Sequence, residues 1–141
     1  MLKLIRKACK DDIKSINVLG EKLHNNFAKT FHLETEIDSV LAIVLVVEIK
    51  GDIVGYLYAL DFGDNIDLLS IFIEEEYRYQ HLGYDLLKYL MEREKNKTIT
   101  LEVSSNNVPA MRLYQKLEFR NVGTRKKYYE NSDAIIMKWG I

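Results

Sequence analysis

The sequence has little cysteine, no long apolar run and almost no net charge. Cys9 is the only cysteine in 141 residues, so no internal disulfide can form, and we expect a small, partly buried side chain there. The longest apolar run, Val40 to Val47, has eight residues, fewer than the roughly 20 that span a bilayer. The first residues show no signal-peptide pattern. These absences predict a cytoplasmic protein without a membrane anchor.

The charge balance is nearly even, with 20 Lys and Arg against 21 Asp and Glu and a formal net charge of -1. Although residues 125–129 read RKKYY, this balance argues against a phosphate-tracking surface and predicts no nucleic-acid partner. His24, His32 and His81 fit no metal-ligand spacing, which predicts no metal. Apolar residues make up 48% of the chain, so we expect one folded domain over residues 1–141. The oligomeric state does not follow from these features.

Hydrophobic periodicity predicts strands and helices in the order β α α β β β α β α β β. Strands are expected over residues 2–6, 40–49, 53–62, 66–73 and 98–103, and in a hairpin of 119–129 and 134–139 joined by 130–133. Helices are expected from an Asp11 or Asp12 cap to Leu23, within 24–39, from Leu82 to Met91, and from an Asn106 or Asn107 cap to about Leu117. Because the strand, helix, strand unit from Ile73 to Val103 requires a parallel pair, the predicted fold class is α/β (α+β). It has a mixed central sheet of about six to seven strands flanked by about four helices.

The turn from Tyr79 to Tyr84 lies where a predicted strand passes into a helix. Such a turn exposes unpaired backbone N–H groups and the positive end of the helix dipole, which together favour an anion. Many such turns only connect two elements, and Glu74 to Glu76 place negative charge just upstream. A phosphate site and a plain loop are therefore both open at this point.

A more specific pattern lies downstream, in LEVSSNNVPAMRLYQKLEF (101–119) and YYENSDAIIM (128–137). Together with YRYQHLGYDLL (77–87), it resembles the GNAT family of acetyl-CoA-dependent N-acetyltransferases, and within it the bacterial ribosomal-protein alanine N-acetyltransferases. The resemblance, detailed over residues 69–137, implies an enzyme that transfers acetyl from acetyl-CoA to a primary amine in a ternary complex. The α-amine of a protein N-terminus, such as that of a ribosomal protein, is the first acceptor implied. A small amine or a lysine side chain is the alternative.

The same resemblance implies roles for individual residues. Backbone groups of Ile71, Phe72 and Ile73 would bond the pantetheine arm, and the pyrophosphate would lie on the N–H groups of Tyr79, Gln80, His81, Leu82, Gly83 and Tyr84. Asn107 would contact the cofactor near the thioester. Glu102 matches the proposed general base and Tyr114 the proposed general acid, while Tyr128 and Tyr129 match tyrosines on the substrate side.

Ordinary pKa values constrain these roles. An α-amine of pKa about 8 is neutral in roughly one molecule in ten at pH 7 and needs about 3 kcal/mol less help than a lysine. A carboxylate such as Glu102, acting through a water, is a sufficient base for it. Full proton donation from Tyr114 to a thiolate is uphill by about 2 kcal/mol, so a hydrogen bond is the better role. A solvated Glu102 and a purely packing Tyr114 are the structural alternatives.

The chain departs from the family where side chains replace glycine. Tyr79 and His81 stand in the loop where the family usually has glycine, and Glu118 stands before Phe119 in the same way. His81 must hold a negative φ or accept a cost on the order of 1 kcal/mol. A degenerate module that binds coenzyme A or a partner protein without turnover is therefore a third interpretation.

Overall fold

A computed structural model describes residues 2–129 and 131–140, and these residues form one seven-stranded sheet. Its strand order is β1-β2-β3-β4-β5-β7-β6, with β4 and β5 parallel and the other described pairs antiparallel. The strands are β1 (Lys3–Lys7), β2 (Ala42–Ile49), β3 (Asp52–Asp61), β4 (Asn65–Ile73), β5 (Thr98–Ser104), β6 (Arg120–Tyr129) and β7 (Ser132–Trp139). The predicted mixed sheet is confirmed, although residue 130 of the predicted hairpin turn lies outside the described residues.

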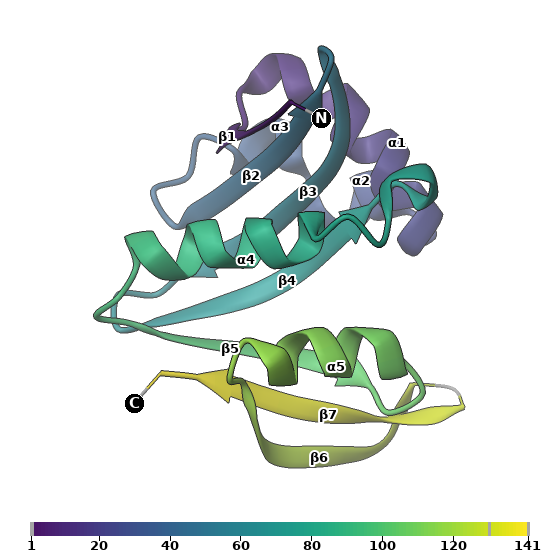
Figure 1. Cartoon of the computed structure of the whole chain (residues 1–141), viewed down its shortest axis with the longest axis vertical. Helices are drawn as coiled ribbons and strands as arrows, with labels where there is room; N and C mark the ends of the chain where they lie inside the picture. Colours follow the sequence, from purple (N-terminus) through teal and green to yellow (C-terminus); the bar gives the residue numbers. More distant parts are fainter. Residues whose placement is uncertain (1, 130, 141) are drawn as a thin grey trace.

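Five α-helices in the described part of the chain cover the two faces of this sheet: α1 (Ile13–Leu23), α2 (Phe27–Phe31), α3 (Leu33–Glu36), α4 (Leu82–Arg93) and α5 (Val108–Lys116). The segment between α1 and β2 forms two short helices where the sequence predicts one, so the structure has one more helix than predicted. Figure 1 shows α4 and α5 in front of the sheet and α1 to α3 behind it. None of these helices has the length and apolar character needed to cross a membrane.

Two apolar cores follow from this arrangement, one on each face. Leu57, Ile66 and Ile99 of the sheet pack with α4 and α5 on one side. Tyr56 and Phe72 alternate to the other side, where they pack with α1, α2 and α3. Alternation along a strand therefore decides which set of helices each side chain faces.

The start of α1 differs from the predicted cap. Asp12 precedes the helix, but its carboxylate caps no helical N–H group. Instead it accepts hydrogen bonds from the Arg6 guanidinium at 2.7 and 2.9 Å and from the Cys9 backbone N–H at 2.8 Å. The Arg6 hydrogen bonds lower the pKa of the Asp12 carboxyl to about 2. Cys9 itself is exposed, so the expectation of partial burial is wrong.

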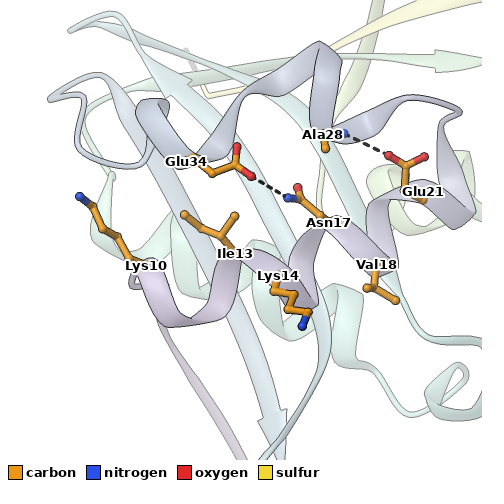
Figure 2. Close-up of a pocket in the computed structure, with 8 residues that line it drawn as sticks. All are labelled: Lys10, Ile13, Lys14, Asn17, Val18, Glu21, Ala28 and Glu34. Atoms are coloured by element: carbon orange, nitrogen blue, oxygen red, sulfur yellow. Dashed lines mark hydrogen bonds between the residues drawn. The ribbon is translucent and has the colours of Figure 1, made fainter.

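Helices α1 and α2 are fixed to each other by a close approach and a carboxylate. A Cβ on Gly20 would lie 2.4 Å from the Phe27 ring, so glycine is required for that ring to pack there. Glu21 accepts hydrogen bonds from the N–H groups of Asn26 and Ala28 at 3.1 and 3.2 Å. A groove of about 560 Å³ is lined by residues of α1, α2 and α3, and none of the predicted site residues lines it. Figure 2 shows the side chains that line this groove.

Strands β4 and β5 separate soon after they begin to pair. Their ladder runs only from Asn65↔Thr98 to Asp67↔Thr100, although both strands continue beyond it. Figure 1 shows them diverging toward the end of the sheet where α4 and α5 begin. A register shift in the β3–β4 ladder leaves Leu69 as an extra residue, a bulge close to this opening. The opening exposes backbone groups that a regular sheet would pair.

Candidate active site

Backbone groups of β4 face the opening at alternate residues. The Glu74 N–H donates to the Val54 carbonyl at 2.8 Å, which fixes the hydrogen-bonding phase of the β3–β4 ladder. Because antiparallel pairs alternate, the N–H and C=O of Phe72 point toward β3, whereas those of Ile71 and Ile73 point into the opening. Of the three predicted pantetheine contacts on β4, the backbone groups of Ile71 and Ile73 are therefore the ones a ligand can reach.

Arg78 partly occupies this edge. Its Nε donates to the Ile73 carbonyl at 3.0 Å, and its guanidinium carbon lies 5.1 Å from the centre of the Phe72 ring. This bond ties the loop before α4 back to the end of β4. The Ile73 N–H and both backbone groups of Ile71 stay available at the opening.

The turn before α4 adopts a left-handed backbone at both positions where a side chain replaces glycine. The φ angle is 63° at Tyr79 and 63° at His81. The chain therefore accepts the conformational cost and keeps the path that glycine would favour. Tyr79 is fully exposed, and the His81 ring lies 5.7 Å from the ring of Tyr84.

The N-terminus of α4 supplies unpaired donors beside this turn. The first helical hydrogen bond runs from the Asp85 N–H to the His81 carbonyl at 2.9 Å, so the N–H groups of residues 82–84 precede it. Gly83 is not in the left-handed region, and a Cβ there would lie 3.4 Å from Leu113 Cδ2, an ordinary contact. The packing of the chain alone does not require glycine at this position. Close approach of a ligand to the backbone at Gly83 would instead require the absence of a side chain.

We expect His81→Gly to raise the free energy of unfolding by about 1 kcal/mol, because glycine adopts positive φ without a Cβ penalty. Urea denaturation of the purified variant measures this change. His81→Ala is the matched control, since it removes the imidazole but keeps a Cβ at the same φ, and it should gain little. Equal stabilisation in both variants would attribute the effect to the imidazole and not to the backbone.

The end of α5 contains a third residue of this kind. Glu118 has φ 71°, with its N–H donating to the Gln115 carbonyl at 2.9 Å and the Phe119 N–H donating to the Tyr114 carbonyl at 2.9 Å. This pair of bonds is a Schellman motif, a helix ending that usually has glycine at the left-handed position. The turn is thus as tight as glycine would make it, and it packs Phe119 5.7 Å from the Tyr114 ring.

Three of the predicted chemical groups come from different elements, β5, α5 and β6. Glu102 alternates with the buried Leu101 and Val103, so its carboxylate lies on the sheet face of α1 to α3 and is 30% exposed. It lies beyond Thr100, where pairing with β4 has ended, and so borders the opening. Tyr114 comes from α5 on the other face, where burial and then the neighbouring Tyr129 raise its pKa to about 12. Burial and the charge of Glu102 raise the pKa of Tyr129.

Asn107 has the capping role that the sequence predicts. Its side-chain oxygen accepts a hydrogen bond from the Ala110 N–H at 3.2 Å at the start of α5. A contact with a cofactor would therefore use the amide NH₂ group.

Two charged residues of the site are absent from the sequence-based prediction. Arg125 Nη2 lies 3.2 Å from Glu102 Oε1. The Asp133 carboxylate accepts the Lys127 backbone N–H at 2.7 Å, a bond that holds the pKa of that carboxyl below its usual value. In a single sequence, the run RKK at residues 125–127 is typical of a solvated strand. The pairing of Arg125 with Glu102 and of Lys127 with Asp133 can be recognised only from the strand register.

Asp133 stabilises a looped-out segment of β6. Arg125 pairs with Ala134 and Tyr129 with Ser132, so three residues of β6, 126–128, stand opposite Asp133 alone. Lys127 in this segment has φ 52°. The loop turns Tyr129 toward Glu102 and leaves Tyr128 55% exposed, with the two tyrosine rings 5.2 Å apart. The two predicted substrate-side tyrosines are thus in different environments.

A sheet opened between two parallel strands, with helix N–H groups beside the opening, can take an extended ligand along β4 and an anion at the start of α4. The described residues contain no group of three His, Cys, Asp or Glu side chains arranged for a metal ion. The unpaired backbone of β4 and the donors of α4 fit the amide groups and pyrophosphate of coenzyme A.

Comparison with known proteins gives the family. Residues 5–119 match the Acetyltransferase (GNAT) family, and the chain belongs to it. A Bacillus subtilis (strain 168) protein, provisionally named a ribosomal protein bS18-alanine N-acetyltransferase, is 38% identical over 98 residues, which cover 66% of this chain and 65% of that protein. The N-alpha-acetyltransferase of Saccharolobus solfataricus is 32% identical over 94% of this chain and 90% of its own. The resemblance stated from the sequence is confirmed, and the chain is an acetyl-CoA-dependent N-acetyltransferase.

A solved structure shows the same fold. The crystal structure of the ribosomal-protein-S18-alanine N-acetyltransferase from Escherichia coli superposes with a TM-score of 0.87 at 24% identity, covering 97% of this chain and 92% of that one. The two chains therefore share one fold.

Proposed function

We propose that this chain acetylates the α-amine of a protein N-terminus, with a ribosomal protein as one candidate acceptor. The observation that carries the proposal is the position of Glu102, a carboxylate at the β4–β5 opening on the sheet face of α1 to α3. An α-amine needs only a modest base because a tenth of it is already neutral at pH 7. The names of the Bacillus and Saccharolobus relatives, a provisional ribosomal protein bS18-alanine N-acetyltransferase and an N-alpha-acetyltransferase, support this choice over lysine.

Acetyl-CoA would enter between the diverging strands. Its pantetheine amides would bond Ile71 and the Ile73 N–H, and its pyrophosphate would lie on the N–H groups of residues 79–84, next to the positive end of α4. The left-handed turn at Tyr79 and His81 supports this, since the loop keeps its path despite two side chains. The replaced glycines were the argument for a degenerate binding module, and this argument is weaker because the loop keeps its path.

The acetyl group would meet the amine between Glu102 and Tyr114. Glu102, through a water, accepts the amine proton as the nitrogen attacks the thioester carbonyl. The Tyr114 hydroxyl, on the other face, donates a hydrogen bond to the thiolate that leaves. Its pKa of about 12 lies about 3.5 units above that of a thiol, so complete proton transfer would be uphill by about 5 kcal/mol. The thiolate is then stabilised in place and protonated by solvent.

The test is mass spectrometry of an acceptor panel after incubation with acetyl-CoA. The panel contains peptides with a free α-amine and no lysine, the same peptides with a blocked N-terminus and one lysine, and a polyamine. A mass increase of one acetyl group on the free α-amine peptides alone is the expected result. Acetylation of the blocked lysine peptides or the polyamine at higher kcat/KM would overturn the choice of acceptor.

A further inference from the structure

Arg125 on β6 reaches Glu102 on β5 across the intervening strand β7. Arg125 pairs with Ala134, which pairs with Ser104, and Glu102 lies two residues before Ser104 on the same strand. Directly paired residues share a face of the sheet, as do residues two apart on one strand, so the guanidinium and the carboxylate lie on the same face, about 12 Å apart at the backbone. The stem of Arg125 crosses β7 at Ala134, whose side chain is only a methyl group.

The guanidinium is held in place but its hydrogen-bonding capacity is unused. Nη2 lies 3.2 Å from the Glu102 carboxylate, and the guanidinium carbon is 5.2 Å from the centre of the Tyr128 ring. The Arg125 N–H groups make no hydrogen bond of normal geometry with any described residue, and the side chain is 55% exposed. An arginine carries five donors in a planar fork suited to a carboxylate. More than half of this side chain is exposed beside the proposed base.

The surrounding side chains on β6 are basic as well. Lys126 Nζ lies 3.5 Å from Asp133, while Lys127 uses its backbone N–H for that residue and its ammonium is in no ion pair within residues 2–129 and 131–140. Within residues 2–129 and 131–140, the carboxylates in ion pairs with this part of β6 are Glu102 and Asp133.

We propose that Arg125 selects acceptors with an acidic residue next to the N-terminal one. This inference rests on the proposed function, because it needs an α-amine seated at Glu102. An extended peptide advances about 3.4 Å per residue, and Arg125 Nη2 lies 3.2 Å from Glu102 Oε1, so the second side chain of a peptide whose α-amine is at Glu102 is within reach of the guanidinium. When Glu102 takes up the amine proton, Arg125 loses its counter-charge, and an aspartate or glutamate of the acceptor replaces it. A basic second residue would leave two cations facing each other.

The experiment compares three peptides that differ only in the second residue: Ala-Asp, Ala-Gln and Ala-Arg at the N-terminus. We expect wild-type kcat/KM to be about tenfold higher for Ala-Asp than for Ala-Arg at low salt, with the ratio falling as salt screens the charges. Arg125→Gln should bring the ratio near one, and Arg125→Lys should restore part of it. Because the ratio is taken within one enzyme, a general loss of activity or folding cancels.

Arg120→Gln is the matched control, an arginine on the same strand that donates to the Gly140 carbonyl, and it should keep the wild-type ratio. Equal ratios in wild-type enzyme and Arg125→Gln, or a wild-type preference for Ala-Arg, would overturn the inference while leaving the acceptor class intact. Failure to acetylate any of the three peptides would overturn the acceptor class and this inference together.

Discussion

Glu102→Gln is expected to lower kcat/KM for an N-terminal peptide by about 10²–10³-fold, the usual contribution of a general base. Glutamine has the shape of glutamate but cannot take up the amine proton. Affinity for coenzyme A, measured by calorimetry, should stay within about twofold, because the carboxylate lies on the acceptor side of the opening. Glu34→Gln, the same change on α3 outside the site, should leave kcat/KM unchanged.

The dependence on pH separates a base that acts during attack from one that only deprotonates the ammonium beforehand. The α-amine of a peptide becomes neutral as pH rises through about 8, so wild-type kcat/KM should rise over that range. A neutral amine must still lose a proton as it attacks, so the defect of Glu102→Gln should persist from about pH 6.5 to about pH 9.5. Recovery of the wild-type rate by Glu102→Gln at high pH would exclude proton transfer to Glu102 during attack. Loss of the exposed pair with Arg125 should cost no more than about 1 kcal/mol of stability.

Tyr114→Phe should lower kcat by about 10–100-fold, since a hydrogen bond to a thiolate is worth about 1.5–3 kcal/mol and tenfold corresponds to about 1.4 kcal/mol. The protein should fold as stably as before, because the ring contact with Phe119 is kept. The hydroxyl makes no hydrogen bond to another described residue. Steady-state kinetics with saturating peptide measures the change, and Tyr89→Phe on α4 is the matched control.

A second measurement tests the hydrogen-bonding role against proton donation. With a pKa of about 12, Tyr114 stays protonated at every pH of an ordinary assay. The pH profiles of wild-type enzyme and Tyr114→Phe should therefore run parallel from pH 6 to 10. A wild-type rate in Tyr114→Phe would return the residue to packing alone, and profiles that converge below pH 10 would show that its proton titrates in the reaction.

The sequence predicts the strands and long helices because their periodicities are local. The β3 and β4 runs and the Leu82 to Met91 stripe end within a few residues of the observed bounds. The cap at Asn107 is also local, and it is confirmed. The cap at Asp12 is wrong because Arg6, on a different element, competes for the same carboxylate.

The site was predictable only where a motif carries it. Glu102 and Tyr114 follow from a family pattern. Arg125 and Asp133 depend on a looped-out register in β6 that no local pattern reveals. The left-handed backbone at His81 and Glu118 also cannot be predicted from the local sequence. The only indication is that the family usually has glycine at these positions.

The early separation of β4 from β5 also has a thermodynamic consequence. Pairing between β4 and β5 stops at Asp67, so the rest of β4 has no partner on that side. The amides of a pantetheine arm would pair with it as a substitute strand. Ligand binding then acts as local folding, so coenzyme A should slow amide hydrogen exchange at Ile71 and Ile73. Phe72, already bonded to β3, should exchange slowly with or without it. The enzyme without ligand is, in this sense, a sheet that lacks one strand, which its substrate would supply.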